Sequence, residues 1–105
     1  MPNLTVSIPH QLGREEARRR IETQLAQLQQ QYGSMLTSMD QRWTDDTLDF
    51  TAGAHGMSVT GRLTVEEQRV VVEIVLPWLL GMFVGRIRNQ IEQQGRLLLE
   101  HRQAG

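Results

Sequence analysis

The side chains with the clearest chemical potential are three histidines and the carboxylates that could accompany them. His10, His55 and His101 lie in two connecting segments and a terminal tail, and none shows the spacing to a serine or carboxylate that marks a local base and nucleophile pair. A hydrolase or cyclase would need His10 or His55 to meet Asp49 or Glu73 in the folded chain. The pattern favours turn or surface positions for these histidines, so we predict no catalytic residue and no enzyme activity.

Metal and cofactor sites are not predicted either. The acidic residues Asp40, Asp45, Asp46 and Asp49 lack the glycine and the terminal glutamate of a calcium-binding loop, so we interpret the middle pair as a turn. Residues 53–56 precede a strand-like segment and not a helix, which argues against a phosphate or dinucleotide loop. The chain has no cysteine and no lysine, which removes thiolate, disulfide and lysine amine chemistry.

Size and charge restrict the class of protein further. The chain has 105 residues, of which 39% are hydrophobic, and this size fits a single domain over residues 1–105. Its formal net charge is -1, so no overall positive field attracts nucleic acid. No apolar run approaches the roughly 20 residues that cross a bilayer, and the N-terminus does not resemble a secretion signal. We therefore expect a soluble, cytoplasmic protein without a transmembrane segment or a nucleic-acid partner.

Alternation of apolar and polar residues predicts the strands. This period of two is typical of half-buried strands, and it marks residues 4–8, 39–44, 47–52, 57–64 and 70–76. Gly61 leaves a gap in the side-chain row of its strand, and we expect Trp43 or Phe50 to fill that gap.

Apolar residues at spacings of three and four predict the first helix. It begins near Arg14, and Gly33 is expected to end it in the left-handed conformation. The glutamine-rich stretch 24–31 is interpreted as the solvent-facing side of this helix.

A closing helix is predicted from Trp78 onward. Its inward face is expected to contain Leu80, Phe83, Val84, Ile87, Ile91, Gln94 and Leu98.

These elements predict an α+β fold. We expect the order strand, helix, three strands, helix (β-α-β-β-β-α), in which a four-stranded antiparallel sheet carries two helices packed on one face. This architecture resembles a reduced helix-grip fold. Residues 100–105 are expected to form a frayed tail.

The closing helix also carries apolar side chains that its inward face does not need. Trp78 and Met82 lie roughly opposite the inward face, and Leu79 lies on its flank. With Phe83 they form a candidate binding surface, since an aromatic ring and a flexible thioether suit contact with apolar partners. A structural role is the alternative, in which Trp78 covers the helix start against the first strand or is buried in a homodimer.

Four short motifs, in their order and spacing, resemble the small bacterial polyhydroxyalkanoic acid system family. They are residues 12–17, Trp43 with 48–50, Gly56 with 59–61, and 76–80, which together run nearly end to end. The resemblance implies a link to storage-polyester granules and supplies no catalytic residue.

If the resemblance holds, we expect a non-enzymatic accessory or regulatory protein that binds the apolar granule surface or a granule-coating protein. A different class of function is also open. A cleft between the C-terminal helix and the sheet could hold a small hydrophobic ligand, such as a hydroxyacyl chain.

Overall fold

The structure is a computed structural model that describes residues 3–35, 38–54 and 56–99, together with their side chains except those of Tyr32, Met35, Ala54 and Trp78. Five strands, two α-helices and two short 3₁₀ helices occur in these residues. In chain order they are β1 (Asn3–Pro9), α1 (Arg14–Tyr32), η1 (Gly33–Met35), β2 (Ser38–Thr44), β3 (Thr47–Ala54), β4 (Met57–Val65), β5 (Arg69–Val75), η2 (Trp78–Phe83) and α2 (Val84–Leu99).

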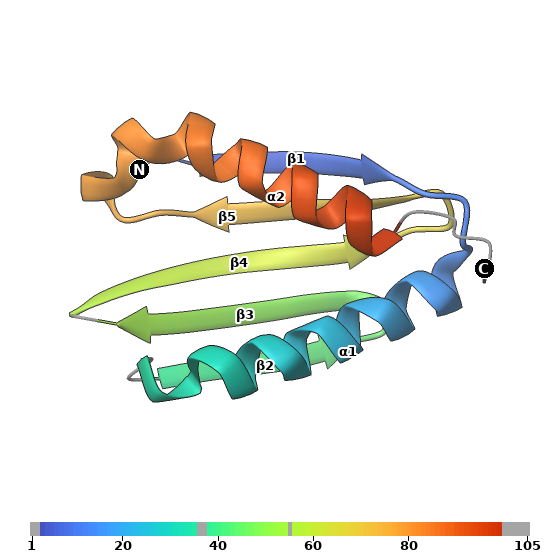
Figure 1. Ribbon diagram of the computed structural model, residues 1–105, viewed down its shortest axis with the longest axis horizontal. Coiled ribbons are helices and arrows are strands. Elements are labelled where there is room, and N and C mark those ends of the chain that lie inside the picture. Colours follow the sequence, from blue (N-terminus) through green and yellow to red (C-terminus); the bar gives the residue numbers. More distant parts are fainter. Residues whose placement is uncertain (1–2, 36–37, 55, 100–105) are drawn as a thin grey trace.

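The strands form one antiparallel sheet in the order β1-β5-β4-β3-β2, and both helices lie on the same face of it (Figure 1). The predicted α+β class and the antiparallel sheet are therefore confirmed. The prediction of four strands is wrong. The expected order allowed only three strands between the helices, whereas alternation marks four segments there and each of them forms a strand.

The predicted turn at Asp45 and Asp46 joins β2 to β3 as a two-residue hairpin connection. Asp45 has a φ of 54°, which is the left-handed region that a short acidic residue tolerates better than most side chains do. This turn fixes the register in which Trp43 lies opposite Leu48.

The apolar core lies between the sheet and the two helices. β1 alternates strictly, with Leu4, Val6 and Ile8 buried and the residues between them exposed. Ala17 and Ile21 of α1 are also buried and pack on this layer. The opposite face of the sheet carries no helix in the described residues, which explains why its side chains are mostly threonines and charged residues.

Two predicted helix boundaries differ from the structure. Gly33 has φ -58° and ψ -35°, so it stays right-handed and begins the 3₁₀ turn η1 in place of a left-handed stop. The closing helix does not begin as an α-helix at Trp78. Residues 78–83 instead form the 3₁₀ helix η2, and α2 begins at Val84. The expected frayed tail, residues 100–105, lies outside the described residues.

Arginine contacts fix the N-terminal half of α1. The Arg18 guanidinium lies 4.3 Å from the centre of the Trp43 ring and donates a hydrogen bond of 2.6 Å to the Asp45 carbonyl. Arg20 donates a hydrogen bond of 3.1 Å to the Leu98 carbonyl near the end of α2. These contacts tie the first half of α1 to the β2–β3 hairpin and to the last turn of α2.

Phe50 fills the gap at Gly61. The sequence had predicted either Trp43 or Phe50 at this place, so one of the two alternatives is confirmed. Phe50 and Gly61 lie opposite each other in the β3–β4 pair. A Cβ atom added to Gly61 would overlap the Phe50 ring and would lie 2.8 Å from the Glu73 carbonyl oxygen of β5. Because that carbonyl belongs to the sheet backbone, the position cannot relax by a side-chain rotation alone.

We expect Gly61→Ala to lower the free energy of unfolding by about 1–3 kcal/mol, the usual cost of overpacking. Gly33→Ala is the matched control, because Gly33 has helical dihedrals and a Cβ there would meet nothing within 4 Å. The control should leave stability unchanged or raise it by up to about 1 kcal/mol. Urea unfolding measures both variants, and equal stability of Gly61→Ala and the unmodified chain would contradict this packing.

Candidate functional site

The predicted apolar surface lies on η2. Leu79 is 54% exposed, Met82 is 84% exposed and Phe83 is 41% exposed. Residues three apart eclipse one another in a 3₁₀ helix, so Leu79 and Met82 share one edge of η2. The structure therefore brings these two side chains together. The predicted α-helical spacing had placed Leu79 on the flank and Met82 opposite the core.

Phe83 and Trp78 are the other two residues of the predicted apolar surface. Phe83 was expected on the inward face of the closing helix, but it is exposed, because the change from 3₁₀ to α geometry occurs directly after it. The side chain of Trp78 lies outside the described part of the structure, so its predicted exposure stays a prediction. We call the exposed apolar surface formed by Leu79 and Met82, together with Phe83 next to Met82 in the chain, the η2 edge.

The two helices separate as they run away from their shared end. Along α1, Ala17 and Ile21 are buried, Leu25 is half-buried and Leu28 is 36% exposed. The apolar side of α1 is therefore less covered toward the C-terminus of the helix. In α2 the buried residue is Leu99, in the last turn, close to the point where Arg20 reaches the Leu98 carbonyl. The helices consequently diverge from that end, as Figure 1 shows.

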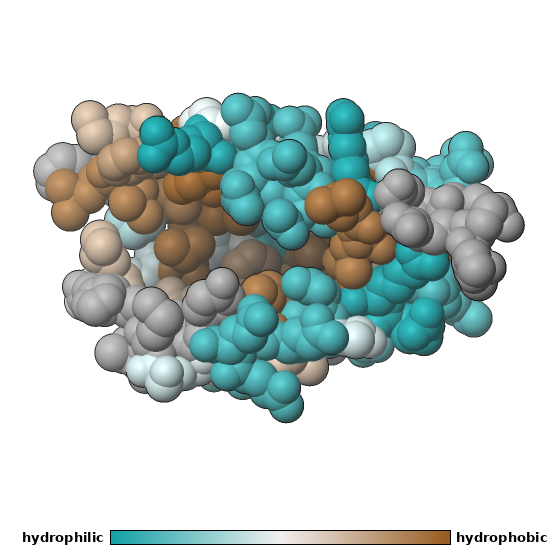
Figure 2. All heavy atoms as spheres, viewed as in Figure 1, coloured by the Kyte–Doolittle hydropathy of each residue, from teal (hydrophilic) through white to brown (hydrophobic). Residues whose placement is uncertain are grey.

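An apolar groove of about 670 Å³ occupies the space between the diverging helices. Its floor is the sheet, and Figure 2 shows a hollow with apolar side chains at its base that continues toward η2. We call it the interhelical groove. Its apolar lining comprises Ile8, Ile21, Leu25, Leu28, Leu63, Val70, Val72, Ile74, Ile91, Leu97, Leu98 and Leu99.

Gly95 of α2 also lines the groove, and a Cβ there would overlap the Cδ1 atom of Ile8. The glycine therefore permits close approach of α2 to β1 at the end where the groove closes. The sequence alone suggests only a weak point in the helix at this position.

Four neutral amides complete the described lining of the groove. Gln24 and Gln31 come from α1, and Gln90 and Gln94 come from α2. Sequence reasoning missed all four, because the stretch 24–31 was interpreted as a solvent-facing side and Gln94 as part of a packed face. One sequence signal could have indicated Gln24 and Gln31 as groove residues, namely their position directly beside the apolar stripe of α1.

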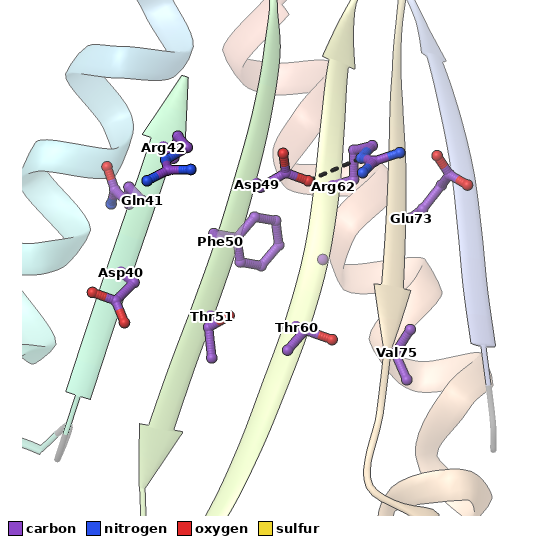
Figure 3. Close-up of a pocket in the computed structure, with 11 residues that line it drawn as sticks. Asp40, Gln41, Arg42, Asp49, Phe50, Thr51, Thr60, Arg62, Glu73 and Val75 are labelled. Atoms are coloured by element: carbon purple, nitrogen blue, oxygen red, sulfur yellow. Dashed lines mark hydrogen bonds and ion pairs between the residues drawn. The ribbon is translucent and has the colours of Figure 1, made fainter. Parts of the chain in front are cut away.

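The uncovered face of the sheet carries a second hollow, which is polar (Figure 3). Its rim includes Asp40, Arg42 and Glu73, and an ion pair joins Asp49 to Arg62 with 2.9 Å between Oδ1 and Nε. The hydrogen bond with Asp49 raises the pKa of the Arg62 guanidinium above its usual value. This face is an ordinary solvated sheet surface with a cross-strand ion pair.

No group of three or more histidine, cysteine or acidic side chains suited to a metal ion occurs among the described residues. The four aspartates of the predicted turn region divide between two places. Asp45 and Asp46 form the β2–β3 turn, where Asp46 makes an ion pair of 3.4 Å with Arg14, whereas Asp40 and Asp49 line the hollow on the uncovered face.

His10 is buried and occupied by structural hydrogen bonds. Its Nδ1 accepts from the Leu12 backbone N–H at 3.2 Å, and its Nε2 lies 3.0 Å from the Glu66 carbonyl, to which the Nε2-protonated tautomer donates. It lines a different hollow from Asp49 and Glu73. His10 is therefore a turn residue that joins the end of β1 to the β4–β5 turn. His55 and His101 lie outside the described residues.

In the described part of the chain, no helix combines the length and the apolar character that crossing a membrane would require.

We expect His10→Ala to lower the free energy of unfolding by about 1–3 kcal/mol, because the Leu12 N–H and the Glu66 carbonyl would lose their buried partner. Gln11→Ala, at the exposed neighbouring position, should change it by less than about 0.5 kcal/mol. Urea unfolding of the two variants is the measurement. A His10→Ala variant as stable as the unmodified chain would show that the ring does not hold this turn.

The family model described as "Putative polyhydroxyalkanoic acid system protein (PHA_gran_rgn)" matches residues 4–99. No curated protein and no solved structure matches the chain.

Proposed function

Because the chain belongs to this family of polyhydroxyalkanoic acid system proteins, we propose that it is a non-enzymatic accessory protein of polyhydroxyalkanoate storage granules. It attaches to the apolar polyester surface of the granule through the η2 edge, from the cytoplasmic side. A granule-coating protein is the alternative partner for the same edge, and a homodimer through this edge is a further alternative.

The observation that carries this proposal is the exposure of adjacent apolar side chains on η2. Met82 is 84% exposed and Leu79 is 54% exposed, although both are residues that proteins usually shield from water. They lie on one edge of a short helix that projects at one end of the sheet (Figure 1). A polyester surface offers the apolar environment that such an edge lacks in water.

The strength of attachment follows from the area involved. Removing about 200 Å² of apolar surface from water contributes roughly 5 kcal/mol, before the cost of fixing the orientation of the protein. This magnitude supports reversible attachment. It suits a regulatory or accessory protein better than a permanent coat.

The non-enzymatic part of the proposal is supported by the position of His10. Both of its ring nitrogens are engaged by backbone groups, so it is not free to act as a general base. The carboxylates Asp49 and Glu73, with which it would have to act, line a different surface hollow.

A second candidate function is favoured by the interhelical groove. Its volume of about 670 Å³ lies within the range of about 300–1,000 Å³ that is typical of small-molecule sites. Its lining is mostly apolar and lies between the C-terminal helix and the sheet. The second proposal is therefore that the chain binds a small hydrophobic ligand there, either alone or together with granule attachment.

We expect the double variant Leu79→Ser/Met82→Ser to bind polyhydroxyalkanoate granules about tenfold more weakly than the unmodified chain, or weaker still, because it removes the main apolar area of the η2 edge. Met57→Ser is the matched control, since Met57 is an exposed apolar residue of β4 that belongs neither to η2 nor to the lining of the interhelical groove. The measurement is the bound fraction after sedimentation with granules, at equal folded stability.

Two granule preparations separate the partners. Binding to granules stripped of protein supports the polyester surface, whereas binding only to granules that retain their proteins identifies a coating protein as the partner. Undiminished binding of the double variant to both preparations would eliminate the η2 edge.

A further inference from the structure

The interhelical groove has a chemical character that restricts its ligand. None of the described residues that line it is charged. An ionised carboxylate or a phosphate inside the groove would therefore lack a cationic partner, and burial of an unpaired charge is costly. The part of a ligand that lies within the groove must be uncharged.

The four glutamines add a second restriction. Gln24 and Gln31 are seven residues apart, and Gln90 and Gln94 are four apart, so each pair lies on one face of its helix. The two pairs therefore place amide groups on opposite walls of the groove above an apolar floor. None of these amides forms a hydrogen bond with another described residue, so their N–H groups are available to a ligand.

The distance between the two amides of α1 restricts the length of the ligand. Seven residues of α-helix span about 10 Å, so the two amides of α1 can contact separate parts of one extended molecule. Each amide can donate through two N–H groups. A ligand that matches this arrangement carries hydrogen-bond acceptors at intervals along an otherwise apolar chain.

We propose that the interhelical groove binds an uncharged oligoester of hydroxyalkanoic acid, with its alkyl groups on the sheet floor and its ester carbonyls accepting hydrogen bonds from the glutamine amides. An ester chain has an acceptor in every repeat, no donor and no charge, which agrees with both restrictions. The inference rests on the second candidate function and names its ligand class. The helix of a second protein copy fits less well, because its backbone acceptors are already used within the helix.

The groove and the η2 edge are related by position. Apolar side chains continue from the hollow between the helices to the region of η2 (Figure 2). A polyester chain segment at a granule surface that η2 contacts could therefore enter the groove without crossing a charged region of the described lining.

The test uses a trimer of hydroxybutyric acid that is acetylated at its hydroxyl end and methyl-esterified at its acid end, so that it carries no charge. An alkane of similar length, without carbonyl groups, is the comparison ligand. Binding to the full chain is measured by calorimetry, and the binding site is located by changes in the NMR signals of α1 and α2.

The variants Gln24→Met and Gln94→Met keep the side-chain volume and remove the amide. We expect each to weaken binding of the oligoester by about fivefold, the effect of one lost hydrogen bond, and to leave alkane binding unchanged. Gln27→Met and Gln93→Met are the matched controls, because these glutamines are exposed on the same helices but do not line the groove. The controls should bind the oligoester as the unmodified chain does.

Three results would overturn the inference, and they separate its failure from that of the proposed functions. Equal binding of alkane and oligoester, with no effect of the glutamine variants, would leave a hydrophobic ligand site but reject ester recognition. No binding of either ligand would reject the second candidate function as well. Oligoester binding that moves NMR signals only of η2 would place the ligand on the granule-attachment edge and exclude the groove. Granule sedimentation with the Leu79→Ser/Met82→Ser variant tests that edge independently.

Discussion

The structure depends on one packing constraint: two helices share one face of a sheet, and their fully buried side chains lie only near a common end. Ala17 and Ile21 in the first half of α1 and Leu99 in the last turn of α2 are buried against the β1–β5 side of the core. Burial of these side chains supplies the apolar area that holds the helices in place. Because the apolar contact weakens toward Leu28, the helices are free to diverge from that end.

Polar contacts maintain the same geometry. Arg20 joins α1 to the carbonyl of Leu98, and Arg18 joins α1 to Trp43 and to the Asp45 carbonyl. Glu16 binds both Arg19 and Arg20, and its hydrogen bonds with them hold the pKa of its carboxyl at about 2, well below the usual value. Arg19 is exposed, so its ion pair with Glu16 adds little stability. The hydrogen bond from Arg20 to the Leu98 carbonyl, in contrast, defines where the two helices meet.

The divergence of the helices creates one of the two apolar surfaces of the described residues, and η2 provides the other. It opens an apolar groove with neutral amides on both walls, and the chain enters α2 through a 3₁₀ helix that exposes Leu79 and Met82. The chain belongs to the polyhydroxyalkanoic acid system family, and the polyester partner that we propose is apolar, uncharged and rich in carbonyl acceptors, which agrees with both features. The polar, uncovered face of the sheet has no comparable specialisation among its described residues.

The sequence by itself determined the elements whose signals are local. Period-two alternation marked every strand, although the expected order counted one too few. Spacings of three and four marked both helices, and the gap at Gly61 indicated a large aromatic neighbour, Trp43 or Phe50, between which the structure selects Phe50. Tertiary structure decided the 3₁₀ geometry of residues 78–83, the exposure of Phe83 and the groove position of the glutamines. The physical reason is that periodicity fixes which side of a helix is apolar, whereas the tilt of that helix depends on contacts with residues distant in the chain, such as those of Arg20 with Leu98 and Gly95 with Ile8.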